Sequence, residues 1–175
     1  TDAQAGAQFD LDAIIRDSST NPLEGVTVSF DHNTTATIAD DQLTTNADGV
    51  VNTTVTVPEN ASVDTQISVS AGDFNPENTS TTTANVTTEA AQPDSLAFVS
   101  DNIVVPSGEA TDVEVEIQDQ FGNHNDSISS GEIDLSSDDT SVIEVTSDAQ
   151  SVSDGSATFT VNATGSSGSV NLTAT

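Results

Sequence analysis

The stretch from Leu11 to Phe30, LDAIIRDSSTNPLEGVTVSF, decides how this chain folds. Apolar and polar residues alternate before Asp17 and again after Gly25, which is the period of a β-strand with one buried face. Asn21-Pro22 and Gly25 lie between the two runs, and residues of these types favour turns. The stretch therefore predicts two strands joined by a turn, and it contains no helical period.

The same plan occurs twice in the chain. Three pairs of segments match, at offsets of 102, 106 and 103 residues: Leu11–Asp17 with Val113–Asp119, Ala47–Thr53 with Ser153–Phe159, and Ile67–Ala71 with Val170–Ala174. The second pair contains Asp-Gly in both copies, and Asp-Gly before an alternating run is a strong hairpin signal. Each copy contains enough short strands for one sandwich, so the sequence predicts an all-β fold with two tandem domains.

The boundary between the copies is expected in Thr88–Asp94, where Pro93 precedes a new apolar run. This gives domains at 1–90 and 91–175. The first is expected to lack an opening strand, because Leu96–Val105 has no counterpart in it. The second is expected to lack a closing strand, because nothing follows that matches Thr81–Thr87. Such a chain is either a fragment of a longer array or a subunit whose edges are completed by strands of its neighbours.

The charge of the chain indicates its solvent. It carries 29 Asp and Glu residues against one basic side chain, Arg16, for a formal net charge of -28. A charge of this size destabilises a compact state through self-repulsion. The Debye length falls from about 10 Å at 0.1 M salt to about 3 Å at 1 M, so brine removes most of the penalty. Regular alternation argues against a disordered acidic tail, and we therefore expect a folded protein adapted to high salt.

Composition also excludes several functions. One cation cannot neutralise a row of phosphates, so nucleic acid is not an expected partner. No apolar run reaches the roughly 18 residues of a membrane span, so direct membrane insertion is not expected either. The chain has no Cys or Lys nucleophile, and His32 and His124 occupy non-equivalent places in the two copies. No catalytic residue is predicted, and the protein is not expected to be an enzyme.

Calcium is the one cofactor that the sequence suggests. Asp119, Asn123, Asn125 and Asp126 offer oxygen atoms within eight residues, and Ca²⁺ is bound by several oxygens from loops. Their spacing is not that of a twelve-residue calcium loop. The counterpart in the first copy, Asp17–Glu24, carries fewer ligands, so a metal site common to both copies is not expected.

Asparagine-linked glycosylation is a second expectation, because the chain is rich in Asn-x-Ser/Thr triplets. Eight sequons begin at Asn33, Asn52, Asn60, Asn78, Asn85, Asn125, Asn162 and Asn171. The alternative is that a β protein rich in Thr and Asn produces such triplets by chance.

The segment from Asp17 to Phe30, followed by Thr44–Val51, resembles the bacterial immunoglobulin-like domains of the invasin and intimin type. The resemblance covers about residues 5–90; in the second copy it keeps the turn Asp119–Asn123 and the pair Asp154-Gly155. It implies two tandem immunoglobulin-like β-sandwich domains. Domains of this family look like spacers and adhesive modules of extracellular, cell-surface proteins, although fold alone does not fix function.

These observations lead to two functional hypotheses. The first is a non-enzymatic stalk or set of adhesin repeats in a cell-surface protein adapted to high salt. The alternative is a subunit of a surface filament or surface layer that polymerises by β-strand complementation between chains. The expected partners are neighbouring repeats or identical subunits, and the surface of another cell.

Overall fold

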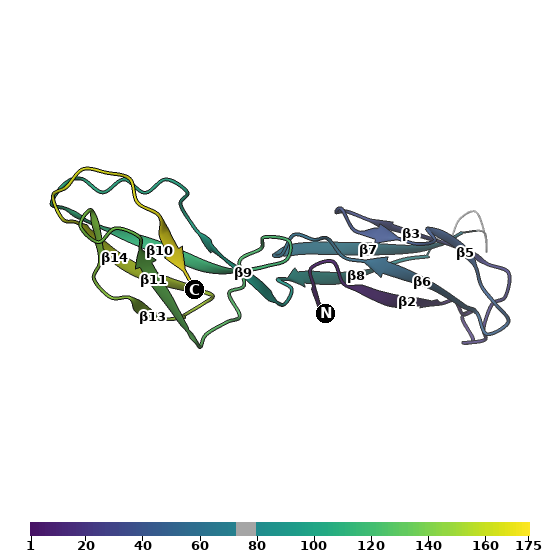
Figure 1. The fold of residues 1–175 in the computed structure, drawn as a ribbon. Helices are drawn as coiled ribbons and strands as arrows, with labels where there is room; N and C mark the ends of the chain where they lie inside the picture. The colour runs from purple at the N-terminus through teal and green to yellow at the C-terminus, as the bar shows by residue number, and fades with distance from the viewer. Residues whose placement is uncertain (73–79) are drawn as a thin grey trace. The chain divides into compact units, whose positions relative to one another are not determined.

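The computed structural model describes residues 1–72 and 80–175, and every helix or strand assigned in them is a β-strand. The chain divides into two compact units, unit 1 at Thr1–Glu89 and unit 2 at Ala90–Thr175 (Figure 1). In the described part of the chain, no helix is long and apolar enough to span a bilayer.

Unit 1 contains two sheets. The larger has the order β1-β8-β7-β3-β5 and consists of β1 (Asp2–Gln4), β8 (Ser80–Glu89), β7 (Val63–Gly72), β3 (Thr27–His32) and β5 (Gln42–Thr44). The smaller has the order β2-β6-β4 and consists of β2 (Gln8–Ile14), β6 (Val50–Thr56) and β4 (Thr37–Ile38). All neighbouring strands are antiparallel except β1 and β8, which are parallel.

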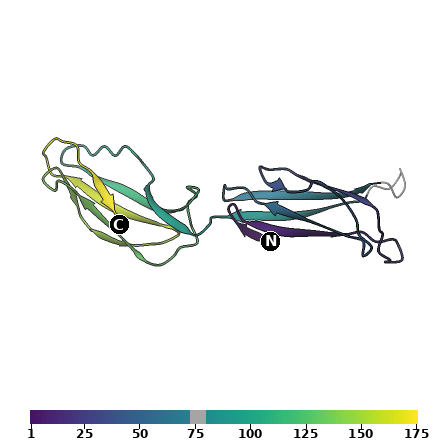
Figure 2. The same cartoon turned by 45° about the vertical axis from the view of Figure 1, so that its right-hand side comes forward.

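Unit 2 also contains two sheets. One has the order β12-β14-β10-β9 and consists of β12 (Ile143–Val145), β14 (Ser156–Ala163), β10 (Ala110–Asp119) and β9 (Pro93–Phe98). The other has the order β13-β11-β15 and consists of β13 (Ala149–Ser151), β11 (Glu132–Ser137) and β15 (Leu172–Ala174). Figure 2 shows the two layers of strands within each unit.

Alternating side chains form the core between the layers. In β14, Ala157, Phe159 and Val161 are buried, whereas Thr158 and Thr160 between them are exposed. The buried Val and Phe side chains contribute about 1.5–3 kcal/mol each. Their partners in unit 2 come from both sheets: Val113, Val115, Ile133, Leu135 and Val152. Unit 1 is built in the same way, from Ala13, Val28, Phe30, Val51 and Val69 and from Val55, Val57, Ile67 and Val86.

The structure corrects two details of the sequence prediction. Unit 1 does open with a strand, β1, although that strand joins the sheet of β8 and not the sheet of β2. In unit 2, β9 pairs with the outer edge of β10. Among the described residues of unit 1, no strand pairs with the corresponding edge of β2. β1 was missed because its three residues are too short to show a period.

The second detail is the register of the last match. Ile67 pairs with His32 and Leu172 with Ser137. Strands β3 and β11 align at an offset of 105 residues. The alignment is set by Phe30 and Leu135, whose N–H groups bond the equivalent carbonyl oxygens of Asp41 and Asp148. Leu172 therefore occupies the position of Ile67, and the offset of 103 residues is wrong by two. A shift of two residues keeps the buried face, so alternation alone cannot detect it.

Two predicted hairpin glycines are packed against the turn between the sheets. Gly49 and Gly155 have φ angles of 72° and 71°, in the left-handed region that favours glycine. A Cβ on Gly49 would lie 2.5 Å from the carbonyl oxygen of Ile15, and one on Gly155 would lie 2.1 Å from that of Asn125. The carbonyl of each glycine also accepts a backbone hydrogen bond, from Ile15 at 2.8 Å and from Ile117 at 2.7 Å.

We expect Gly155→Ala to destabilise unit 2 by about 3–5 kcal/mol, because it adds a clash with Asn125 to the strain of a positive φ. Gly108→Ala is the matched control, since Gly108 has a φ of 78° with no atom within 4 Å of its Cβ position. It should cost only the left-handed strain, about 1–2 kcal/mol. Urea unfolding in concentrated salt measures both. Equal losses would show that the close approach at Gly155 is unimportant.

Candidate functional site

The turn after β10 is organised by the carboxylate of Asp119. Its Oδ1 accepts hydrogen bonds from the backbone N–H groups of Phe121 and Asn123, both at 2.9 Å. Its Oδ2 accepts one from Asn123 Nδ2 at 2.9 Å and one from the backbone N–H of Ala91 at 2.8 Å. The carboxylate thus closes its own turn and also holds the segment that leads into unit 2.

Asn125 holds the other polar group of Ala91. Its Nδ2 donates to the Ala91 carbonyl oxygen at 2.6 Å, and its Oδ1 accepts from Ser127 Oγ at 2.6 Å. Asp119 is 1% exposed and Asn125 is 3% exposed. We call the arrangement of Asp119, Asn125 and Ala91 the Ala91 clamp, because it satisfies both backbone polar groups of one residue from two buried side chains.

The environment of Asp119 favours its charged form. Burial by itself would raise the pKa of the carboxyl group, since it penalises the anion. The hydrogen bonds from Asn123, Ala91 and Phe121 act in the opposite direction, and the pKa lies below its ordinary value of 3.8. Hydrogen bonds to an ionised acceptor are the stronger kind, so the clamp is held by a carboxylate at neutral pH.

Unit 1 contains the same turn without the clamp. Asp17 accepts from the backbone N–H groups of Ser19 and Asn21 at 2.8 and 2.9 Å, and from Asn21 Nδ2 at 2.9 Å. Hydrogen bonds from Asn21 lower the pKa of Asp17 as well. No fourth donor to Asp17 is present among the described residues, and Leu23 stands where unit 2 has Asn125.

Three of the four residues predicted to bind calcium, Asp119, Asn123 and Asn125, make hydrogen bonds in the turn. The Asp119 carboxylate accepts four hydrogen bonds, and the side-chain oxygen of Asn125 accepts one. A cation bound by these oxygens would have to displace the protein donors. Asn123 is one of those donors, and Asp126 is exposed. The described residues contain no group of three or more His, Cys, Asp or Glu that could hold a metal ion. These side chains therefore form the turn, and only Asp119, Asn123 and Asn125 are brought together.

The asparagines of the eight sequons differ in exposure. Exposed asparagines are Asn33, Asn52, Asn60, Asn85 and Asn171, and Asn162 is half-buried. Asn125 is buried and donates to Ala91, so its amide nitrogen is not accessible in the folded unit. Asn78 lies outside the described residues.

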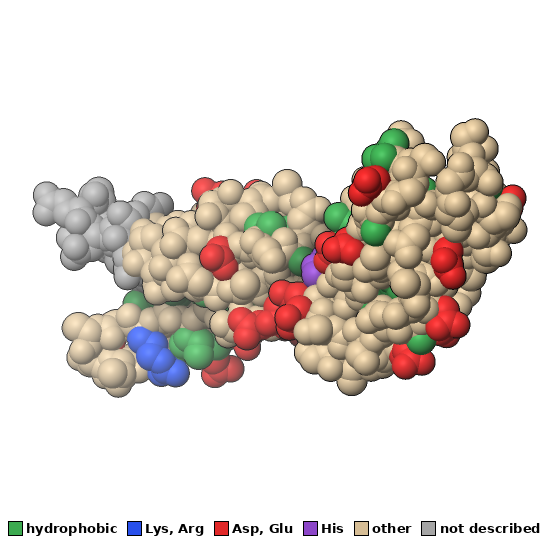
Figure 3. Space-filling view, turned by 90° about the vertical axis from the view of Figure 1, so that its left-hand side faces the viewer, with side chains coloured by type: hydrophobic (Ala, Val, Ile, Leu, Met, Phe, Trp, Pro, Cys, Tyr) green, Lys and Arg blue, Asp and Glu red, His purple; other side chains and the backbone are tan. Residues whose placement is uncertain are grey.

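The acidic residues do not converge on a site. Carboxylates are scattered over the face shown in Figure 3, beside a single basic side chain. The guanidinium of Arg16 donates to the carbonyl oxygen of Thr20 at 3.0 Å, within its own turn. The two histidines belong to different units, where a ring nitrogen of His32 bonds the Thr34 carbonyl at 3.0 Å and His124 is exposed.

Comparison with solved structures identifies the fold. The Escherichia coli adhesin FdeC aligns with 99% of this chain and 56% of its own at 19% identity and a TM-score of 0.52. The D0–D1 domain of intimin aligns with 99% of this chain and 86% of its own, at 18% identity and a TM-score of 0.41. A glycosyl hydrolase of family 2 from Bacteroides cellulosilyticus covers 97% of this chain and 27% of its own, at 13% identity and a TM-score of 0.44. The chain has an immunoglobulin-like, all-β fold.

The predicted fold class is thereby confirmed. No protein-family model matches the sequence, and comparison with curated proteins found no match. The immunoglobulin-like fold does not by itself decide what this chain does. The chain spans 56% of the length of the adhesin that it matches.

The sequence contained a signal for the turn but none for Ala91. Asp17 and Asn21 recur as Asp119 and Asn123 at the same offset of 102 residues. An Asp repeated at one position of a turn in both copies indicates a structural role better than a cation site. Ala91 contributes only its backbone, which no side-chain pattern reveals.

We expect Asp119→Ala to destabilise unit 2 by about 3 kcal/mol, because it leaves buried N–H groups without an acceptor. Hydrogen exchange at the Ala91 amide should speed up markedly. Asp17→Ala is the matched control: its turn is more exposed and holds no neighbouring segment, so its loss should be smaller. An Asp119→Ala protein in which Ala91 exchanges at the original rate would contradict the clamp.

The low pKa of Asp119 also predicts a pH dependence. Because the folded state binds this proton less readily than the unfolded state, its stabilisation is present above pH 3.8 and is lost as pH falls below that value. Asp119→Asn removes the ionisable group, so its free energy of unfolding should be lower at pH 7 and fall less steeply under acid. Parallel acid-unfolding curves for both proteins would contradict this assignment.

Proposed function

We propose that this chain is a non-enzymatic structural or adhesive segment of an extracellular, cell-surface protein that works in high salt. The observation that carries the proposal is the Ala91 clamp. The carbonyl of Glu89 is bonded to Ala5 within unit 1, and the N–H of Ala91 is bonded to Asp119 within unit 2. Ala90 alone stands between these bonds, so the connection between the units has little free chain, as a stalk requires.

Two further features support this role. The FdeC structure, which supports the fold, is that of an adhesin. The exposed sequons at Asn33, Asn52, Asn60, Asn85 and Asn171 would place glycans on the outer surface, where they add hydration without disturbing the core. Neighbouring repeats, identical subunits and the surface of another cell are the partners that such a segment would contact.

The positions of the acidic residues support the proposed adaptation to high salt. Glu114, Glu132 and Asp134 point outward from strands whose inward residues are buried. They coat the sandwich and oppose one another electrostatically, and molar salt screens that repulsion. The surface therefore supports a protein whose folded state depends on salt.

The salt dependence is directly measurable. Circular dichroism should show β-structure at about 1 M salt and its loss on dialysis to roughly 0.1 M or below, where the Debye length is at least about 10 Å. A variant with Glu114→Gln, Glu132→Gln and Asp134→Asn should unfold at a lower salt concentration, since three repelling charges are removed. Identical spectra in low and high salt would refute the adaptation.

Surface location is tested on intact producing cells. Immunogold labelling should find the chain outside the cell envelope, and a glutamyl endopeptidase should remove it without lysis. Lysine-directed reagents are unsuitable, because the chain has no lysine. Protection from the protease until the cells are lysed would contradict an extracellular role.

A second candidate function is a subunit of a surface filament or surface layer that is joined by strand complementation between chains. The observation that favours it is in unit 2, where β15 is an edge strand. An unpaired edge is a template for a strand of another chain.

A further inference from the structure

Unit 1 contains one parallel strand pair, and its geometry determines how the unit responds to tension. β1 and β8 run in the same direction, with Ala3 opposite Thr88. Every other strand pair in the described residues is antiparallel. Along unit 1, β1 is the first strand and β8 is the last. The pair therefore connects the two ends of the unit directly.

Backbone hydrogen bonds join the two strands along their shared length. The N–H of Thr87 donates to the Thr1 carbonyl at 3.1 Å, and the N–H of Ala5 donates to the Glu89 carbonyl at 2.8 Å. In a parallel pair every second residue of each strand faces its neighbour, so the N–H and C=O groups of Ala3, midway between these bonds, also point to β8. We call the bonds between residues 1–5 and residues 87–89 the β1–β8 latch.

Both strands of the latch are anchored in the unit. β8 pairs with β7 along almost its whole length. The turn after β1 is tied to the segment that follows β6. There the N–H of Gly6 donates to the Pro58 carbonyl at 3.0 Å, and the N–H of Val57 donates to the Ala7 carbonyl at 3.0 Å. Tension on either strand is therefore transmitted to the latch and not taken up by loose chain.

The latch is also shielded from water. Thr88 is 0% exposed and Ala5 is 5% exposed. Ala3 packs against a core cluster that includes Val57 and Val86. Water competes for the donors and acceptors of a stretched hydrogen bond, which is why the net contribution of an accessible bond is small. Burial limits this competition while the latch is under tension.

The relative direction of the strands decides how tension acts on these bonds. A chain that is pulled on both sides of unit 1 draws β1 toward its N-terminal end and β8 toward its C-terminal end. In parallel strands these directions are opposite along one axis, so the bonds are sheared and share the force. First and last strands that were antiparallel would be drawn apart from one end, and their bonds would break one after another.

We propose that unit 1 bears tension along the chain and that the β1–β8 latch is the element that resists it. The inference rests on the proposed function as a surface segment, which is under tension whenever the surfaces that it connects are drawn apart. Ala90 alone separates the latch residue Glu89 from Ala91, which the clamp holds in unit 2. Little free chain therefore lies between the latch and the next folded unit.

The test compares two directions of pulling on the full 175-residue chain. The chain has no cysteine, so two introduced cysteines are its only attachment points. Thr1→Cys with Ala90→Cys shears the latch, whereas Thr1→Cys with Thr83→Cys unzips it from the end where β1 begins. In single-molecule force spectroscopy at about 1 M salt, the sheared latch should survive at least about tenfold longer at the same force, because its bonds must break together. Equal lifetimes would overturn the proposal.

A matched pair of proline variants tests the latch itself. Ala3→Pro removes an N–H that faces β8, and Gln4→Pro removes one that points away from it. β1 is an edge strand, where proline is tolerated, and circular dichroism should confirm that both variants are folded. In shear, Ala3→Pro should open at least about tenfold faster than Gln4→Pro. Equal opening rates would place the resistance elsewhere in unit 1 and overturn the latch.

The latch and the proposed function can fail separately. Equal lifetimes in the two pulling directions overturn the latch, and labelling of the chain outside the cell envelope would still support the surface role. A latch that resists shear in a chain that is protected inside the cell supports the latch and contradicts the surface role.

Discussion

Both units depend on an aspartate carboxylate that accepts the N–H groups of the turn between their sheets. Asp17 and Asp119 stand where the chain leaves one layer, at the ends of β2 and β10, and crosses to the other. Such a crossing removes backbone N–H groups from both ladders, and a buried N–H without an acceptor is costly. The carboxylate supplies two acceptors from one residue, and the nearby glycine allows the hairpin to approach closely. The layers can then pack face to face.

The core between the two layers of each unit is built mostly from small side chains. Surface charge can therefore matter for the net stability of the fold. Val, Ala, Leu and Ile fill most of the core, with Phe159 the one aromatic residue fully buried in unit 2. The net stability of a domain is a small difference between large terms. Repulsion within the proposed coat of carboxylates would therefore be large relative to this small net stability, which is why we propose that the folded state depends on salt. The carboxylate of Asp119 differs from this coat, because its charge is buried and stabilised by four hydrogen bonds inside the protein.

Alternation and repetition were sufficient to predict the all-β fold class and the immunoglobulin-like sandwich. They do not decide between two physical interpretations of the same sequence feature. Asp119 and Asn125 have the composition of a cation site, and only the direction of their lone pairs, toward N–H and O–H donors, shows that they form a turn. Asn125 also begins a sequon, which is buried because Ala91 lies against it. β1 depends on parallel pairing with a strand more than eighty residues away, and such a contact leaves no local periodicity.

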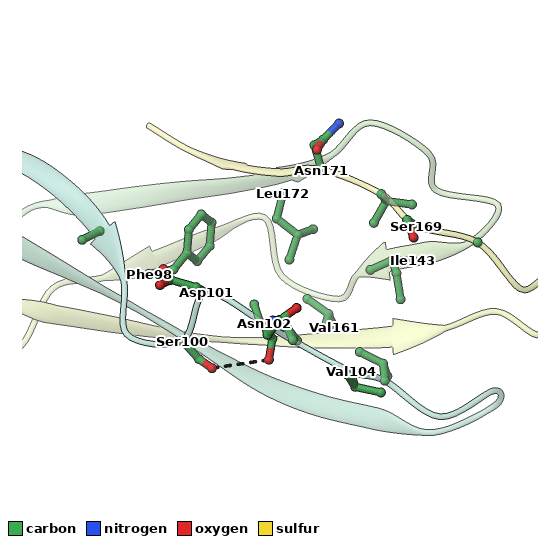
Figure 4. Close-up of a pocket in the computed structure, with 15 residues that line it drawn as sticks. Phe98, Ser100, Asp101, Asn102, Val104, Ile143, Val161, Ser169, Asn171 and Leu172 are labelled. Atoms are coloured by element: carbon green, nitrogen blue, oxygen red, sulfur yellow. Dashed lines mark hydrogen bonds between the residues drawn. The ribbon is translucent and has the colours of Figure 1, made fainter.

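The acidic coat and the exposed strand edges constrain each other. Proteins commonly protect exposed strand edges with charge, which repels a second edge. At molar salt the Debye length is about 3 Å, so charges beyond direct contact no longer give that protection. The edge of β15 also borders an apolar groove that includes Phe98 and Leu172 (Figure 4), and apolar surface is driven together whatever the charge around it. If the protein works in brine, as we propose, charge alone would protect its exposed strand edges less than it does in dilute buffer.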